Sequence, residues 1–559
     1  MASSHRGVDE ENQKDRPSTL PFSRSTTEDT ASVENVSMTS SVEATYEPKW
    51  PRSWRAYACW LGCFFLMFNS WGLVNAYGTF SSYYVGNSLR GVDQLELNLI
   101  GSTQSALVLL FSAPVGKLLD AGHFRYVIAT GTFLVPFGLF MLSVAHPTGD
   151  APASFGSVWA TQGFVVGLGM AFFFVSSSQI AATWFPNNKA LSTGVVACGA
   201  SVAGVVYPAM IRFLIEELGF NNAVRGIAGL AGVTCVYSLI FATPNPAHVH
   251  PKSQSYRKLS TWIDQEAISN KAFCWFTAAV AFLFLGFYPV FFNLEEWAAV
   301  SGLGTRGGSQ APISATSPTI APMQTYFMLM IMNGASTFGR LAFAFFGDHT
   351  GAINMHIGTQ IVSSLLIYIL WTLANSTAAA IAFCVFFGMF SGAVIGLPPA
   401  SMANILNCTY TENSNKHFAH SKLGQWTGMM YSAAAIPSLI GPLIAGHLVT
   451  EYSTYITVQL WSAISLTLSA VCMIVARWYL PCMDGAHVST HLYRFFGKHE
   501  KAEWSEKRRV SRATVDSTNP FNLSRSSTRV NSKAASRQMS EEKIETVPEA
   551  AVLAPERNV

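Results

Sequence analysis

The chain has 559 residues, of which half are hydrophobic and only 12% are charged. Soluble proteins carry charge on about a quarter of their residues, so this composition is typical of a membrane protein. A net charge of +3 is too small to indicate nucleic-acid binding. We see neither a phosphate-binding loop nor a cluster of His, Asp or Cys at a membrane boundary, so the sequence predicts no cofactor, no metal and no enzymatic activity.

Polar segments at both ends contrast with the apolar middle of the chain. Residues 1–52 are rich in Ser, Thr and Glu and lack the apolar core of a signal peptide, so we expect a disordered cytosolic tail. Residues 481–559 are expected to form a second disordered cytosolic tail. The first apolar run must then serve as both the targeting signal and the first membrane helix.

Twelve apolar runs lie between these tails, and each is long enough to span a bilayer, which takes about 20 residues. They cover residues 56–80, 97–119, 126–145, 158–180, 190–215, 224–242, 272–294, 323–346, 353–374, 378–400, 424–447 and 455–479. The sequence therefore predicts an all-α membrane protein of twelve transmembrane helices in two six-helix halves, 53–243 and 272–480. Residues 244–271 are expected to form a cytosolic linker.

Basic residues in the connections predict the orientation of these helices. The even-numbered connections, which follow the second, fourth, sixth and tenth runs, hold nine basic residues: Lys117, Arg125, Lys189, Lys252, Arg257, Lys258, Lys271, Lys416 and Lys422. The odd-numbered connections hold three: Arg90, Arg225 and Arg306. Because cytosolic loops are enriched in Lys and Arg, both termini are predicted to be cytosolic. We expect a multi-pass monomer of the plasma membrane, with the lipid bilayer and a small-molecule substrate as its partners and no nucleic acid.

A glycine–proline pattern recurs in the fifth and eleventh runs. Gly194 is followed by Pro208 fourteen residues later, and Gly428 is followed by Pro442 at the same spacing. These residues occupy corresponding positions in the two halves. The repeat favours a duplicated fold in which the four residues shape helix packing or hinges.

The connection between the second and third runs reads Gly116-Lys117-Leu118-Leu119-Asp120-Ala121-Gly122-His123-Phe124-Arg125. It resembles the signature loop of the major facilitator superfamily. Gly116 would permit close helix approach, and Arg125 could pair with an acidic group when the cytosolic side is closed. We interpret Gly116, Asp120, Gly122 and Arg125 as a latch, which Asp348 echoes in the second half; the alternative is an ordinary tight, charged turn.

Arg340 is the one clearly intramembrane charge in the sequence. It lies about 9–12 Å inside the inner end of its helix, at about 1.5 Å per residue. A buried arginine costs several kcal/mol unless it faces a partner or a cavity, which favours contact with a substrate or coupling ion. The alternative is that Arg340 reaches the interface or pairs with Asp348.

Three further charges lie close to the outer ends of their helices. We expect Arg212 to pair locally with Glu216 or Glu217. Glu295 and Glu296 are expected to cap the end of the seventh helix, with a proton relay as the alternative.

The segments Trp60–Phe65 and Asn69–Phe80, the stretch from Trp184 to Leu191, and Gly339-Arg340 together resemble the monocarboxylate-porter branch of the superfamily, and its fungal members most. The resemblance covers about residues 50–480 and implies that Arg340 contacts a substrate anion. Animal lactate carriers have a lysine where Asn75 stands and an aspartate where Ser336 stands. We place Asn75 beside Arg340 as a substrate-binding candidate, and the two departures argue against proton–lactate symport.

These features predict a secondary active transporter that moves a small organic solute by alternating access. An anionic cargo is expected, either a monocarboxylate or a carboxylated metabolite, and a proton is a candidate coupling ion. Two alternatives stay open: an efflux carrier for a fungal secondary metabolite, and a transporter-like nutrient sensor that does not transport.

Overall fold

The computed structural model describes residues 51, 53–147, 153–185, 189–246, 262–306, 323–411 and 416–480. Every regular element in these ranges is a helix, apart from one isolated backbone bridge between Thr305 and Gln324. The predicted all-helical fold is confirmed. Both predicted tails, except Pro51 at the edge of the first, and most of the predicted linker lie outside the described residues.

The helices follow the predicted runs closely. The first group is α1 (Trp54–Phe68), α2 (Trp71–Asn75), α3 (Tyr77–Tyr83), η1 (Tyr84–Ser88), α4 (Gln94–Leu110), α5 (Ser112–Asp120), α6 (Phe124–Ala145), α7 (Phe155–Val158), η2 (Trp159–Val166), α8 (Gly167–Trp184) and α9 (Lys189–Phe241). The second group is α11 (Gln265–Ser269), α12 (Lys271–Val300), α13 (Tyr326–Thr350), α14 (Ala352–Leu366), η3 (Ile367–Trp371), α15 (Thr377–Gly396), α16 (Pro398–Thr411), α17 (Lys416–Tyr452) and α18 (Ile456–Trp478). One predicted run, 378–400, is divided between α15 and α16 because Pro398 begins a new helix.

In the described part of the chain, eleven helical segments are long and apolar enough to cross a membrane. One of them is α9, which at 53 residues would extend about 80 Å if straight, far more than one bilayer of about 30 Å. It breaks at Gly219, whose φ of 77° lies in the left-handed region that favours glycine. The break separates the fifth and sixth predicted helices, so twelve spans result.

Large apolar side chains cover the outside of the bundle. On α6, Phe133, Phe137, Phe140 and Val144 are exposed and follow one face at helical spacing. Many polar side chains are instead buried between helices. This arrangement suits a surface that faces lipid, in which a helix must satisfy its polar groups internally.

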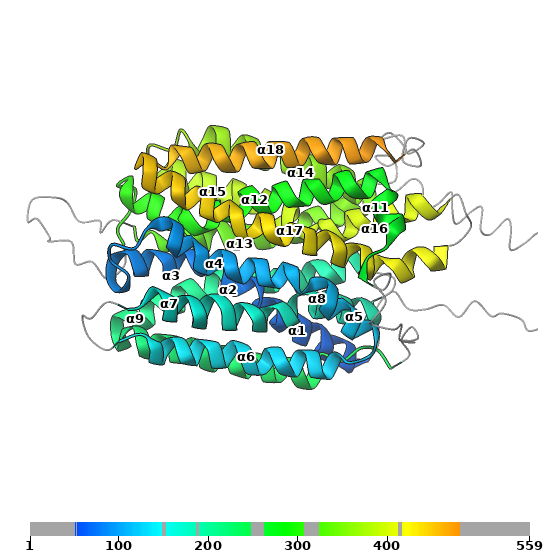
Figure 1. Ribbon diagram of the computed structural model, residues 1–559, viewed down its shortest axis with the longest axis horizontal. Coiled ribbons are helices and arrows are strands. Elements are labelled where there is room, and N and C mark those ends of the chain that lie inside the picture. The colour runs from blue at the N-terminus through cyan, green and yellow to red at the C-terminus, as the bar shows by residue number, and fades with distance from the viewer. Residues whose placement is uncertain are drawn as a thin grey trace, which may run out of the picture. The chain divides into compact units, whose positions relative to one another are not determined.

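The two groups of helices meet along a seam (Figure 1). We define the seam as the contacts of α9 with α13 and of α4 and α5 with α17. Where α4 and α5 meet α17, the seam runs from a hydrogen bond between Asn98 and the Pro442 carbonyl to the contact of Ala113 with Gly428. A hydrogen bond from Ser201 to Ser336 joins the first pair.

We call the two ends of the seam the near side and the far side. The near side is where the first described helix begins and the last described helix ends: Trp54 packs on Phe241 there, and Lys271 lies over the ring of Tyr479. The far side holds the break at Gly219 and the end of α12. Under the predicted orientation, the near side faces the cytosol.

Candidate substrate site at the seam

Arg340 lies in the seam, on the face of α13 that meets α9. Its side chain is buried, with 6% exposed. Its Nη1 donates a hydrogen bond to the Ala197 carbonyl at 2.8 Å, and its Nε donates to Ser336 Oγ at 3.4 Å. No carboxylate among the described residues forms an ion pair with it. The structure therefore places a buried positive charge in the seam beside neutral partners; the side chain of Asp348, the alternative partner, is outside the described residues.

Asn75, the second predicted substrate contact, approaches the same part of α9. Its Nδ2 donates to the Ala200 carbonyl at 3.4 Å, one helical turn from the carbonyl that Arg340 contacts. Asn75 is also buried. The structure thus brings the two candidates to neighbouring turns of one helix, although they are 265 residues apart in sequence.

Sequence reasoning missed Asn333, which lies two turns before Arg340 on α13. It is fully buried, and its side-chain oxygen accepts no hydrogen bond from any described residue. Buried polar atoms almost always have a partner, so this acceptor is suited to a ligand's donor. The signal was available: Asn333, Ser336 and Arg340 have the spacing that places polar residues on one helical face.

An aromatic cluster joins the two groups of helices next to these polar residues. It consists of Trp71, Phe174, Phe284, Tyr288 and Tyr431. Trp71 stacks on Tyr288 with ring centroids 5.4 Å apart, and Phe174 meets Tyr431 at 5.1 Å. Tyr288 also lies close enough to interact electrostatically with Arg340. The indole nitrogen of Trp71 is buried without a hydrogen-bond partner among the described residues, so the cluster offers an apolar surface with one unused donor.

Towards the far side, Arg212 of α9 forms an ion pair with Glu295 of α12, which belongs to the other group of helices. The guanidinium Nη2 lies 3.5 Å from Glu295 Oε1, and the two side chains are 3% and 0% exposed. The local partner that we expected for Arg212, Glu216 or Glu217, is not the one in this ion pair, and both of these glutamates are exposed. Tertiary packing instead brings the Glu295 carboxylate of α12 to Arg212 from 83 residues away in the sequence.

The expected cap at the end of the seventh helix was also wrong. Both Glu295 and Glu296 lie inside α12, which continues to Val300. Glu296 instead pairs with Arg306, whose Nε donates to its Oε2 at 3.0 Å. The chain after the helix folds back and supplies the counter-charge.

The predicted latch residues lie at the near side and have different surroundings. Gly122 has φ of 83°, and Gly351 in the second half has φ of 90°, so both turns use a left-handed glycine. The Asp120 carboxylate lies 3.8 Å from the position that a Cβ on Gly424 of α17 would take, which places it at the seam. Arg125 is exposed and lies over the ring of Phe124.

Gly116 does not serve as a site of unusually close helix approach. A Cβ built on it would lie 3.5 Å from Gln179 Nε2, an ordinary contact. It does line a small near-side cavity together with Asp120 and, from the other group of helices, Trp262 and Gly424. Asp348 belongs to α13, and its side chain lies outside the described residues.

The repeated glycines face equivalent neighbours. A Cβ on Gly194 would lie 3.5 Å from Ala344 of α13, and one on Gly428 would lie 3.0 Å from Ala113 of α5. Each glycine thus faces a helix of the opposite group across the seam. Pro208 and Pro442 lie inside α9 and α17.

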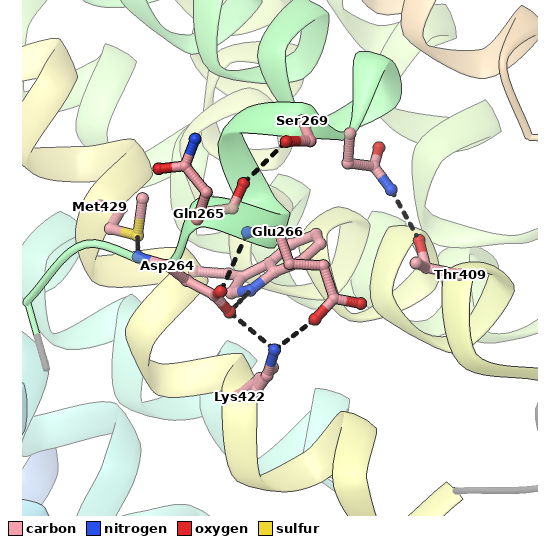
Figure 2. Close-up of polar contacts among 9 residues, drawn as sticks. Asp264, Gln265, Glu266, Ser269, Thr409, Lys422 and Met429 are labelled. Atoms are coloured by element: carbon pink, nitrogen blue, oxygen red, sulfur yellow. Dashed lines mark hydrogen bonds and ion pairs between the residues drawn. The ribbon is translucent and has the colours of Figure 1, made fainter. Parts of the chain in front are cut away.

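A linker clamp, formed by Asp264, Glu266, Lys422 and Trp426, holds the short helix α11 against α17. Figure 2 shows Lys422 between the two carboxylates. Its Nζ lies 2.9 Å from Asp264 Oδ2. Trp426 Nε1 donates to the same Asp264 oxygen at 2.9 Å. The amide of Glu266 donates to Asp264 Oδ1, so this carboxylate also caps α11. Sequence reasoning missed the clamp, because its members are up to 162 residues apart.

The clamp should make stability depend on pH. Partial burial of Asp264 opposes its ionisation, but hydrogen bonds from Lys422 and Trp426 outweigh burial and hold the pKa of Asp264 below its ordinary value. A lowered folded-state pKa means that this stabilisation is present at neutral pH and is lost as the pH falls through that pKa. We expect Asp264→Asn to lower stability by about 1 kcal/mol at neutral pH and to leave little difference in acid.

Thermal denaturation in detergent across the acidic range checks this expectation. The control is Glu266→Gln, whose carboxylate is 48% exposed, and which we expect to change the midpoint little. Equal losses for Asp264→Asn at neutral and acidic pH would contradict the assignment.

Comparison with known proteins agrees with this architecture. Residues 59–410 match the Major Facilitator Superfamily. The aspyridones efflux protein apdF of Emericella nidulans is 28% identical to this chain, in a match that covers 73% of this chain and 75% of apdF. The agnestins efflux protein AgnL12 of Paecilomyces divaricatus is 24% identical to this chain, in a match that covers 76% of this chain and 87% of AgnL12.

A solved structure shows the same fold. The nucleoside transporter NupG, crystallised as a mutant, aligns with a TM-score of 0.53 at 15% identity, covering 76% of this chain and 99% of that one. The family match covers more than half of the chain and runs from the first helix to α16. This chain is therefore a multi-pass membrane transporter that belongs to the Major Facilitator Superfamily.

Proposed function

We propose that this protein exports a small organic metabolite that carries a negative charge and an apolar, aromatic-sized body. The single observation that carries the proposal is Arg340, a buried guanidinium in the seam whose described partners are a backbone carbonyl and a hydroxyl. A charge in this setting is costly without a counter-ion. A carboxylate of the cargo would supply that counter-ion in bidentate geometry.

The surroundings of Arg340 support a cargo larger than a simple monocarboxylate. The aromatic cluster presents stacked rings from both groups of helices, and flat apolar molecules bind such surfaces well. The Trp71 indole nitrogen and the Asn333 side-chain oxygen would each gain a hydrogen bond from a polar substituent. Asn75 of α2 contacts α9 one turn further along, at the Ala200 carbonyl, and is our second substrate contact.

The relatives support export over uptake. The printed names of apdF and AgnL12 describe efflux of aspyridones and agnestins. The Gly339-Arg340 pair still supports a place near the monocarboxylate porters. Asn75 and Ser336 stand where lactate carriers have their lysine and aspartate, so lactate itself is a poor fit to this site.

Transport would proceed by alternating access of two halves, 53–243 and 272–480, joined by the linker 244–271. Opening on either side must separate the seam there. At the near side this breaks the contact of Asp120 with α17, so we retain Asp120, Gly116 and Gly122 as part of the latch. Gly194, Gly428 and their prolines would shape the helices that move. We place both termini in the cytosol and the protein, as a monomer, in the plasma membrane.

A comparison of metabolites inside and outside cells tests the proposed export. Cells of the source organism with and without the gene should differ in at least one acidic, aromatic compound, which accumulates inside when the gene is deleted and appears in the medium when it is restored. Mass spectrometry of both fractions provides the measurement. Accumulation in the medium after deletion would instead indicate uptake and would contradict export.

A further inference from the structure

A cavity of about 380 Å³ lies at the far side, and all the residues that line it belong to the second group of helices. Its walls come from the end of α12, the chain after η3, and the turn that leads into α18. The volume is within the range of small-molecule binding sites, about 300–1,000 Å³. Trp297 lines the cavity from α12, nine residues beyond Tyr288 of the aromatic cluster, or about 14 Å along the helix. The cavity is therefore separate from the proposed cargo site at Arg340.

The floor of the cavity is apolar and carries an unused hydrogen-bond donor. Trp297 and Trp371 are both buried and meet edge to face, with ring centroids 5.8 Å apart. Gln459 of α18 holds this floor, since its Nε2 donates to the Trp371 carbonyl at 3.3 Å. The Trp371 indole nitrogen is buried without a hydrogen-bond partner among the described residues. Buried donors almost always have a partner, so this N–H is suited to an oxygen of a ligand.

The rim of the cavity consists of small polar side chains. Ser301, Asn375 and Ser453 are exposed there, and Thr372 and Thr454 are half-buried. Ser453 has a φ of 51°, in the left-handed region that residues other than glycine rarely adopt. Backbone strain of this kind is concentrated at binding and active sites. The rim thus presents hydroxyl and amide groups, in part from a turn held in a costly conformation.

The described residues that line the cavity include no charged side chain. The neighbouring charges, Glu296 and Arg306, pair with each other. An ion in the cavity would lose its hydration without gaining a counter-charge from the lining, so the site favours a neutral ligand. A sugar ring has both surfaces that the cavity requires, a C–H face for the tryptophans and hydroxyl groups for the rim. The lining is therefore suited to a neutral, polyhydroxylated group.

Apolar side chains at the mouth of the cavity indicate that this group is attached to a lipid. Val300 and Ile456 line the cavity and are exposed. One turn deeper in the membrane, Ile369 of η3 and Leu460 of α18 continue the exposed apolar surface, and these two elements are in contact. We propose that the cavity binds the neutral sugar headgroup of a glycolipid in the far-side leaflet, with its acyl chains along η3 and α18. The bound sugar links the end of α12 to η3 and α18.

Hydrogen exchange of the full-length protein in lipid bilayers tests this proposal. The protein is purified without sugar-based detergents, which would occupy the cavity, and is placed in phosphatidylcholine nanodiscs that contain or lack glucosylceramide. We expect glucosylceramide to slow backbone exchange about fivefold in residues 298–303, 371–376 and 451–458, because a bound ligand suppresses local opening. Ceramide, which has the same chains without the sugar, should leave exchange unchanged, and so should the anionic lipid phosphatidylserine.

Three variants show whether the effect arises in the cavity. Ser301→Trp fills the cavity from its rim and should abolish the response to glucosylceramide. Asn375→Ala removes one exposed amide outside the helices and should weaken the response without disturbing the fold. Ser154→Trp is the matched control, because Ser154 is an exposed serine before α7 in the first group of helices, and it should keep the full response.

The comparison has outcomes that would overturn the proposal. These are an equal response to ceramide or phosphatidylserine, an unchanged response in Ser301→Trp, and the absence of any response to glucosylceramide. Slowed exchange with dissolved methyl glucoside alone, equal to that with glucosylceramide, would assign the cavity to a free sugar and overturn the lipid as its source. The measurement needs no cargo, so its failure leaves the export proposal standing.

Discussion

Arg340→Ala should abolish export while the protein still reaches the membrane. The substitution removes the only described cation of the seam that can hold a cargo carboxylate at this depth. Losing one member of a buried charged contact costs about 2–5 kcal/mol, or roughly 30-fold to several-thousand-fold in affinity. Fold stability should survive, because no described carboxylate pairs with Arg340 and none is left alone.

Export of the metabolite found in the deletion comparison provides the measurement, with surface delivery followed in parallel. Arg340→Lys keeps the charge but loses the bidentate geometry, so we expect weak residual export. Arg225→Ala is the matched control, because Arg225 is an exposed arginine of α9 whose hydrogen bonds to described residues go to Ser143 and Asn222. Normal export by Arg340→Ala would exclude Arg340 as a substrate contact.

Gly339→Ala should prevent stable folding, although it adds only one methyl group. A Cβ on Gly339 would lie 1.7 Å from the Met389 carbonyl oxygen, a backbone atom of α15 that cannot rotate away. Gly388 makes the reverse approach, with its Cβ position 2.3 Å from the Met332 carbonyl oxygen of α13. The two helices would have to separate along this crossing, at a cost of about 3 kcal/mol or more.

The yield of monodisperse protein in detergent and its thermal denaturation midpoint test this expectation. Gly358→Ala is the matched control: its Cβ meets nothing within 4 Å, so the change should be neutral or stabilise α14 by up to about 1 kcal/mol. A wild-type midpoint for Gly339→Ala would show that α13 and α15 do not cross this closely. In that case the added methyl group would also not displace Arg340, which is the next residue.

The membrane spans could be read from the sequence because crossing a bilayer requires a continuous apolar run, which is a property of one segment at a time. For the same reason the runs at 126–145 and 455–479 match α6 and α18 within two residues. The break at Gly219 was also visible as a polar interruption between two runs. The repeat of Gly194 and Gly428 predicted corresponding positions in two duplicated halves, and in the structure each glycine faces a helix of the opposite group.

The contacts that side chains make between helices could not be predicted from the sequence in this way. The resemblance singled out Arg340 and Asn75, but only packing shows that they meet neighbouring turns of α9. The aromatic cluster is invisible in a chain with 39 phenylalanines, because most of them face lipid or core. Trp71 and Tyr288 stand out only once α2 and α12 stack them.

By itself, the sequence determined that this protein spans the membrane twelve times and that one membrane-spanning helix carries a charged residue, Arg340. The tertiary structure decided which charges are paired. Arg212 pairs with Glu295 of α12, and Lys422 pairs with Asp264 of the linker. The physical reason is that apolar length acts locally along the chain, whereas the stability of a buried charge depends on which helices pack around it.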